Sequence, residues 1–244
     1  MKVLVTGHKG YLGSHFVESY HRDFDIVGYD RKEGDELLDY NNLLKKIQGC
    51  EQVIHLAAIP KPVEGKTFTE YMDNNVRGTE YVLHAAVESH VKRIVYASST
   101  TIYGIEKGIP FNIPIQENQP IISQYISAEK LHCRDIDLSY HVSKVMAEQE
   151  LAWYGLNKKI EAIALRFGPI DKVFLGTSVS MENALQAIYL AMISKREFWY
   201  EAFSIVDDIS HINIEKARRL LGYVPKMTQY KKEQIHSVLQ DKAE

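Results

Sequence analysis

The sequence has few cysteines, no long apolar run and no block of charges of one sign. Its two cysteines, Cys50 and Cys133, share no metal-ligand spacing and cannot form a disulfide framework, so a reducing, cytoplasmic location is expected. The apolar runs are far shorter than the ~18 residues that span a bilayer, so no membrane segment is expected. Lys and Arg number 29 against 32 Asp and Glu, and this near balance argues against a nucleic-acid partner.

Metal chemistry is not indicated either. His8, His15 and His21 have no carboxylate or cysteine partners at ligand spacing, so we expect no metal site. The composition is that of an ordinary globular protein, with 244 residues of which 45% are apolar and 25% charged. A chain of this length buries about 70% of its unfolded surface, so its core can position an active site without a metal or a disulfide.

Short apolar runs alternate with longer segments of helical period along most of the chain. Strands are predicted at residues 2–6, 25–29, 52–56, 93–97 and 160–166. Helices are predicted at residues 11–22, 40–48, 67–90 and 140–154. Strands that lack polar alternation and are separated by helices are typical of a parallel sheet covered on both faces. The sequence therefore predicts a doubly wound α/β fold.

Two stretches depart from this alternation. Residues 105–138 contain three prolines and no sustained period, which predicts a functional loop or an insertion near a site. After Arg166 the pattern changes again. A helix at 180–194, a strand at 203–206 and a helix at 213–221 are predicted there.

A glycine-rich turn directly follows the first predicted strand. Gly7, Gly10 and Gly13 lead into the helix at 11–22, which provides the tight turn, close backbone approach and helix amino end that bind a pyrophosphate. A plain turn between a strand and a helix is the alternative. The residues expected to contact a dinucleotide here are Gly7, Gly10, Tyr11, Leu12 and Gly13.

An acidic residue, Asp30, follows the second predicted strand. A carboxylate at this point accepts hydrogen bonds from the two ribose hydroxyls of NAD and repels the 2′-phosphate of NADP, so NAD is the expected cofactor. Arg31 follows immediately, and a guanidinium beside the ribose is how NADP is accommodated. The preference for NAD over NADP therefore stays open at this point.

Hydride transfer to or from a sugar carbon requires a base that takes the hydroxyl proton. A Tyr four residues before a Lys on one helix face supplies it, because the ammonium stabilises the phenolate and lowers the tyrosine pKa from about 10. The chain has three pairs with this spacing: Tyr103/Lys107, Tyr140/Lys144 and Tyr154/Lys158.

Only one of these pairs is expected on a helix. Gly108 and Pro110 follow the first pair, and Gly155 falls within the third, where a helix is expected to end. Tyr140 and Lys144 begin a predicted helix between the fourth and fifth strands. We therefore assign the catalytic pair to Tyr140 and Lys144.

Several motifs occur in one order along nearly the whole chain. They are Thr-Gly-x-x-Gly-x-x-Gly at 6–13, His-Leu-Ala-Ala at 55–58, Asn-Val-Arg-Gly-Thr at 75–79, Ser-Ser-Thr-Thr-Ile-Tyr-Gly at 98–104, Tyr-x-x-x-Lys at 140–144 and Leu-Arg-Phe-Gly-Pro at 165–169. Together they resemble the extended short-chain dehydrogenase/reductase family, in its NAD-dependent epimerase/dehydratase group acting on sugars. The resemblance implies a Rossmann-type NAD-binding domain at residues 1–168 and a small substrate-binding region at 169–244.

The resemblance also implies roles for single residues. Tyr140 is the proton acceptor, Lys144 tunes it and holds the cofactor ribose, and Ser99 hydrogen-bonds the reacting hydroxyl. Further cofactor contacts are implied for Asp39, which reaches the adenine, for Leu56, Ala57 and Ala58, which line the cofactor, and for Asn75, which props the site. Substrate contacts are implied for Ser99, Thr100, Arg166 and Lys172. Plainer roles stay open for two of them, since Ser99 also suits a turn cap and Asn75 a helix cap.

Departures from the family pattern narrow the reaction. Dehydratases of the group carry an Asp-Glu pair after the position of Ser99, and Thr100 and Thr101 stand there instead, so dehydration is disfavoured. The segment after Arg166 is short and resembles that of compact uronate-type and hexose-type dehydrogenases, with Lys172 as the one candidate ligand for a substrate carboxylate. This shortness suggests a smaller substrate than a nucleotide sugar.

The leading hypothesis from the sequence is an NAD-dependent oxidoreductase that oxidises a hydroxyl of a sugar or sugar derivative, with Tyr140 as base. An NAD-dependent nucleotide-sugar 4-epimerase is the alternative, and a non-catalytic NAD-binding protein is the second alternative. In relatives, the helices corresponding to 67–90 and 140–151 pair with their copies, so the resemblance also implies a homodimer.

Overall fold

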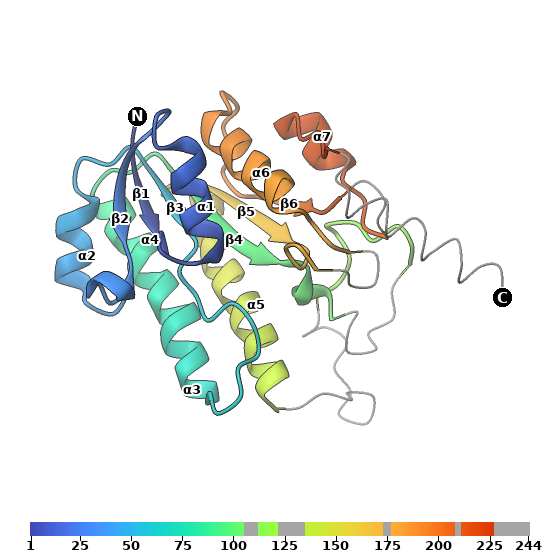
Figure 1. Cartoon of the computed structure of the whole chain (residues 1–244), viewed down its shortest axis with the longest axis horizontal. Coiled ribbons are helices and arrows are strands. Elements are labelled where there is room, and N and C mark those ends of the chain that lie inside the picture. The colour runs from blue at the N-terminus through green and yellow to red at the C-terminus, as the bar shows by residue number, and fades with distance from the viewer. Residues whose placement is uncertain (105–111, 122–134, 173–176, 208–210, 227–244) are drawn as a thin grey trace.

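Six parallel strands form one sheet at the centre of the protein (Figure 1). The structure is a computed structural model that describes residues 1–104, 112–121, 135–172, 177–207 and 211–226. The strands are β1 (Lys2–Thr6), β2 (Asp25–Tyr29), β3 (Gln52–His55), β4 (Arg93–Ser99), β5 (Glu161–Phe167) and β6 (Glu201–Ile205). Their order is β2-β1-β3-β4-β5-β6, and every neighbouring pair is parallel. The predicted doubly wound α/β fold is confirmed as a Rossmann-type sheet.

Helices cover both faces of this sheet (Figure 1). One face packs against α1 (Tyr11–Tyr20), α6 (Met181–Ile193) and α7 (Glu215–Leu221). The other packs against α2 (Tyr40–Ile47), α4 (Gly78–Glu88) and α5 (Asp135–Leu156). The first strand shows how the sequence builds two cores, because Val3 and Val5 belong to the first and Leu4 to the second. Successive side chains of a strand point to opposite faces, so an apolar run without alternation requires a cover on each side.

The predicted helix at 67–90 is divided into three parts. It begins as α3 (Phe68–Tyr71), whose amino end is closed by reciprocal hydrogen bonds between Thr67 and Glu70. A π-helical turn, η2 (Met72–Arg77), follows and leads into α4. A π turn adds a residue to the helical repeat and is frequent at functional sites. Here it carries Asn75, whose contacts are described below.

The direction of the chain changes between β1 and β3. From β1 the chain passes to β2 on one side, and after α2 it returns to β3 on the other side of β1. The connections that leave the carboxyl ends of β1 and β3 therefore diverge, which opens a crevice between them. Gly7 follows β1 and Leu56 follows β3, so the glycine turn lies at this crevice.

The region after residue 168 contributes β6 and α6 to the same layered structure. The division into a cofactor domain and a substrate region at residue 168 stays a prediction. Most of the 105–138 stretch lies outside the described residues. Within the described residues, no helix is both long enough and apolar enough to cross a membrane.

Candidate active site

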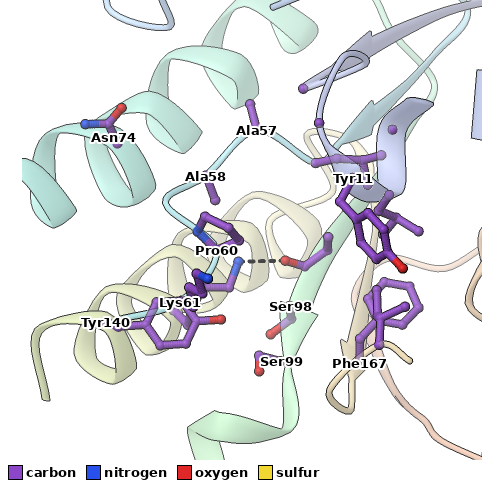
Figure 2. Close-up of a pocket in the computed structure, with 18 of the residues that line it drawn as sticks. Tyr11, Ala57, Ala58, Pro60, Lys61, Asn74, Ser98, Ser99, Tyr140 and Phe167 are labelled. Atoms are coloured by element: carbon purple, nitrogen blue, oxygen red, sulfur yellow. Dashed lines mark hydrogen bonds between the residues drawn. The ribbon is translucent and has the colours of Figure 1, made fainter. Parts of the chain in front are cut away.

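A cleft of about 1060 Å³ runs along the carboxyl ends of the strands (Figure 2). Most of the residues selected from the sequence line it: Gly7, Gly10, Tyr11, Leu12, Gly13, Asp30, Leu56, Ala57, Ala58, Ser99, Thr100, Tyr140, Lys144 and Lys172. These residues come from separate parts of the chain. They are brought together because parallel strands all end at one edge of the sheet.

The glycine turn is fixed by close backbone packing. Gly7 has a φ of +72°, and a Cβ on it would lie 2.8 Å from the Ala57 amide nitrogen. A Cβ on Gly13 would lie 2.1 Å from the Gly7 carbonyl oxygen. A side chain at either position would force the turn away from the loop after β3 or away from α1. The glycines therefore bring two backbone segments to the floor of the cleft.

The amino end of α1 opens into this cleft. Its N-cap residue is Gly10, no side chain of the described residues caps it, and its first turn has no acidic residue. The N–H groups of a first helical turn have no partners within the helix, and the helix dipole makes this end positive. The arrangement fits an anionic group such as a pyrophosphate.

Asp30 ties the glycine turn to the end of β2. Its buried carboxylate accepts hydrogen bonds from the Lys9 amide (2.9 Å) and the Lys32 amide (2.8 Å), one on each oxygen. Each carboxylate oxygen has two acceptor sites, so both retain the capacity to accept a bond from a hydroxyl in the cleft. Asp30 thus has the geometry for a vicinal diol, and Arg31 also lines the cleft beside it.

Ser99 lies at the end of β4 and has two roles. Its Oγ accepts a hydrogen bond from the Thr101 amide (3.2 Å) and begins the 3₁₀ turn η3 (Thr100–Tyr103). It also lines the cleft, where Figure 2 shows it beside Ser98 on the side toward which the Tyr140 hydroxyl points. The turn-cap interpretation and the cleft interpretation therefore hold together.

Tyr140 and Lys144 lie one turn apart on α5, and both line the cleft. The Lys144 ammonium donates to the Ala97 carbonyl (2.6 Å) and lies 4.4 Å from the centre of the Tyr96 ring. Burial lowers the pKa of Lys144 to about 7. A lysine with such a pKa responds to charges near it, and it places a cation beside the strand that carries Ser99.

The other two Tyr–Lys pairs do not reach the cleft as pairs. Tyr103 is the last residue of η3 and is buried, its hydroxyl accepts from Arg166, and Lys107 lies outside the described residues. Tyr154 lines a separate depression near the far end of α5, and Lys158 follows the end of that helix. The choice made from helix boundaries therefore agrees with the positions of the side chains.

Asn75 braces the site from behind. Its Oδ1 accepts from the Ile59 amide (2.7 Å), and its Nδ2 donates to the Ser143 hydroxyl (2.9 Å). Ser143 lies between Tyr140 and Lys144 on α5. Asn75 is buried, does not line the cleft, and joins the loop after β3 to α5; its expected cofactor contact stays a prediction.

Comparison with known proteins identifies the family. Residues 3–170 match the model of the NAD dependent epimerase/dehydratase family. The chain belongs to this family. The family is NAD-dependent, and its solved structural neighbours include proteins crystallised with NAD.

The curated relatives are longer proteins. The chain is 32% identical over 215 residues to UDP-glucose 4-epimerase of Lactobacillus helveticus, which covers 80% of this chain and 59% of the relative. It is 28% identical over 159 residues to the uncharacterized UDP-glucose epimerase YtcB of Bacillus subtilis, covering 54% of this chain and 50% of the relative. The chain thus spans about half the length of the curated relatives it matches.

Solved structures with the same fold cover nearly all of the chain. UDP-glucuronic acid 4-epimerase from Bacillus cereus in complex with NAD has a TM-score of 0.76 and 22% identity, over 94% of this chain and 95% of that one. A mutated uronate dehydrogenase has a TM-score of 0.74 and 19% identity, over 98% of this chain and 86% of that one. A short-chain dehydrogenase/reductase superfamily protein from Agrobacterium tumefaciens with bound NAD has a TM-score of 0.77 and 18% identity, over the full length of both chains. At these identities the likeness shows the fold alone.

Two residues expected at the cleft of this epimerase/dehydratase family member are not among the residues that line it, and their contacts with cofactor and substrate stay predictions. Asp39 does not line the cleft, because its carboxylate accepts from the Asn42 amide (3.1 Å) and caps α2. Arg166 does not line it either, because its guanidinium forms a buried ion pair with Glu148 beneath the sheet edge.

Two loops of the cleft were missed from the sequence. The first is Asp35, Glu36 and Leu37 between η1 (Arg31–Glu33) and α2, and the second is Pro60, Lys61 and Pro62 after β3. An acidic residue directly before a helix is a preferred cap. Had Asp39 been assigned to the cap, the nearby acids Asp35 and Glu36 would have been the next candidates for the cleft. Figure 2 shows Pro60 and Lys61 on the loop near Tyr140, so Lys61 adds a cation to this end of the cleft.

Proposed function

We propose that the protein oxidises a hydroxyl of a sugar or sugar derivative by hydride transfer to NAD. The observation that supports this most is one continuous cleft with two distinct ends. One end carries the glycine turn and Asp30, which suit a dinucleotide. The other carries Ser99, Tyr140 and Lys144, which suit removal of a hydroxyl proton.

The residues present fit NAD. The pyrophosphate would lie against the Gly7 turn and the amino end of α1, and the adenosine ribose would lie at Asp30. Ala57 and Ala58 would flank the cofactor from the loop after β3. When bound, NAD supplies the acceptor for the hydride that leaves the sugar carbon. The chain itself supplies binding, orientation and the base.

In this proposal Tyr140 takes the proton of the reacting hydroxyl. The Lys144 ammonium favours the phenolate form of a nearby tyrosine, because an opposite charge stabilises the ionised state. Ser99 orients the hydroxyl by a hydrogen bond, and Thr100 and Lys172 border the space for the rest of the substrate. Holding the donor carbon and the base in one geometry is the main contribution that such a site makes to rate.

Two outcomes of this chemistry are open to test. A dehydrogenase releases the oxidised sugar and NADH, whereas a 4-epimerase returns the hydride to the opposite face and shows no net NADH. The leading proposal is the dehydrogenase, since Lys172 and the segment after β5 resemble compact dehydrogenases. The 4-epimerase is favoured by the names of the curated relatives, UDP-glucose 4-epimerases among them.

The experiment incubates the pure protein with NAD and a panel of sugars, sugar phosphates, uronic acids and nucleotide sugars. Absorbance of NADH and NMR of the sugar are both recorded. NADH with a free or phosphorylated sugar supports the dehydrogenase. Interconversion of two nucleotide sugars without NADH supports the epimerase. Tight NAD binding with neither product, and a Tyr140→Phe variant that behaves as wild type in the cell, supports a non-catalytic NAD-binding protein.

A homodimer remains part of the proposal. On α5, the apolar side chains of Met146, Trp153 and Leu156 are exposed, with Leu156 at 69%. Contact with a second copy along α4 and α5 would bury them. Light scattering that gives a monomer mass at all concentrations would remove the homodimer and leave the proposed chemistry unaffected.

A further inference from the structure

A buried carboxylate, Glu148, lies directly behind the catalytic end of the cleft. Its side chain is 1% exposed. It accepts hydrogen bonds from the Ser98 hydroxyl, from the Arg166 guanidinium (Nε at 3.1 Å) and from the Tyr200 hydroxyl (3.1 Å). Ser98 belongs to β4, Arg166 belongs to β5 and Tyr200 directly precedes β6, so one carboxylate joins these three segments to α5.

Arg166 completes the network. Besides Glu148, its guanidinium donates to the Tyr103 hydroxyl (2.9 Å) and to the Glu117 carbonyl (2.9 Å). The Glu148 charge holds the pKa of Arg166 above its ordinary value, against the effect of burial. Arg166 is therefore charged, and among the described residues its guanidinium is held by Glu148, Tyr103 and Glu117.

This network adjoins the proposed catalytic residues at two places, one along α5 and one along β4. Glu148 lies four residues after Lys144 on α5, so the two side chains share one face of the helix. Ser98 directly precedes Ser99 at the end of β4. A change at Glu148 is thus transmitted to the cation through charge and to Ser99 through the strand end.

The surroundings of Lys144 determine what the Glu148 charge does. Lys144 faces Tyr140 and Glu148 on α5, Tyr96 on β4 and His55 on β3, with Arg166 on β5 behind Glu148. Burial lowers the pKa of His55 to about 3, so that ring is neutral and adds no charge at neutral pH. Burial also lowers the pKa of Lys144, and the Glu148 charge acts against that shift.

We propose that Glu148 is a positioning residue that keeps Lys144 protonated and holds the end of β4 that carries Ser99, while Arg166 limits the charge that Glu148 exerts on Lys144. The inference deepens the proposed function, because it assigns the control of its cation to a residue outside the cleft lining. The effect of Glu148 on Lys144 is nevertheless independent of any substrate. It can therefore be measured without turnover.

The test follows the protonation of Lys144 in the full chain by NMR of lysine labelled with ¹³C at Cε. The resonance is assigned by its loss in Lys144→Met. Glu148→Gln keeps the shape and removes the charge, and we expect it to lower the pH midpoint of Lys144 by about one unit. Glu161→Gln, which changes a second ion pair at the opposite end of β5, is the matched control and leaves the midpoint unchanged.

Removal of one partner leaves Arg166 as an unpaired buried charge, which is strongly destabilising. The double variant Glu148→Gln/Arg166→Gln removes both charges and keeps hydrogen-bonding groups in place. We expect its Lys144 midpoint also to lie below that of the wild type, by less than in the single variant. An unchanged midpoint in the folded double variant overturns the proposal, whether or not the single variant folds.

Turnover provides the second readout once a substrate is known. Activity that needs the ammonium falls as the pH rises through the Lys144 pKa, so Glu148→Gln shifts this fall to lower pH and reduces kcat with little change in KM. A purely structural role would reduce kcat at every pH and leave the fall where it is, which overturns the proposal. If no sugar is turned over, the proposed function fails while the NMR shift still decides the role of Glu148.

Discussion

An ion pair between an arginine and a glutamate lies at each end of β5, and the two pairs have different surroundings. At the amino end, Arg93 pairs with Glu161 and donates to the carbonyls of Ala191 and Ser194, which fastens the end of α6 to the sheet. At the carboxyl end, Arg166 pairs with Glu148 behind Ser98 and Lys144. A buried ion pair by itself therefore does not mark a site. The position of the pair along a parallel sheet does, because ligands bind at the carboxyl ends of the strands.

The largest expected difference between the two ends concerns two tyrosines of α5. Tyr140→Phe removes the proposed base at the carboxyl end and should lower turnover by about 10² to 10⁴-fold, because a general base contributes on this scale. Tyr154 also has a lysine four residues on, but it lies far from the cleft, near the amino ends of the strands. Tyr154→Phe should therefore retain wild-type turnover. The measurement is the initial rate with NAD and the active sugar. Equal losses in the two variants would contradict the assignment.

Two glycines with positive φ provide the next comparison. Gly7→Ala and Gly49→Ala share the cost of placing a side chain in the left-handed region, since φ is +72° and +74°. Only at Gly7 would the new Cβ meet backbone, at 2.8 Å from the Ala57 nitrogen. We expect NAD affinity to fall about 100-fold in Gly7→Ala and to be retained in Gly49→Ala. Calorimetric titration with NAD measures both, and an unchanged affinity in Gly7→Ala would place the dinucleotide elsewhere.

Two aspartates lie at opposite ends of β2, and their substitution should change NAD affinity by a smaller factor than Gly7→Ala does. Asp30→Asn removes a charged acceptor at the carboxyl end, and we expect about tenfold weaker NAD binding, ~1.4 kcal/mol, with less discrimination against NADP. Asp25→Asn changes an exposed residue at the amino end and should bind NAD as the wild type does. Dissociation constants for NAD and NADP test this. A preference for NAD that survives in Asp30→Asn would assign cofactor selection to another residue.

The smallest expected effect on activity is at the amino-end ion pair. Glu161→Gln leaves the buried Arg93 without its charged partner, and the free energy of unfolding should fall by about 1–3 kcal/mol. Turnover per folded molecule should not change, because the pair is remote from the cleft. Urea denaturation and active-site titration separate the two quantities. Lost turnover in fully folded Glu161→Gln would show that the two ends of β5 are not independent.

Much of the fold was predictable from local pattern. Strands β1 and β2 have the predicted bounds, and the other strands differ from their predicted ranges by one or two residues. Apolar runs without alternation are a strong signal because both faces of each strand are buried. The π turn was not predictable, since nothing in the apolar spacing of 67–90 distinguishes it from a continuous helix.

The site was predictable where backbone chemistry demands a residue type. Gly7, Gly13 and the Tyr140/Lys144 spacing follow from turn geometry and helix period. The sequence did not show that Asp39 caps α2 or that Arg166 forms a buried pair with Glu148, because such contacts depend on the tertiary structure. Lys61 was missed because a lysine in a loop between prolines carries no periodic signal. No sequence pattern indicates that Glu148 contacts Ser98, because this contact joins α5 to β4 across 50 residues of the chain.

The central claim is that the carboxyl end of the sheet binds NAD with its reactive end beside Tyr140. A crystal structure of the protein with NAD tests this most directly. The account predicts the pyrophosphate at the Gly7 turn, the adenosine ribose at Asp30 and the nicotinamide ring between Ser99 and Tyr140. A nicotinamide ring placed away from Tyr140, or a protein that binds no NAD in such crystals and in solution, would contradict it.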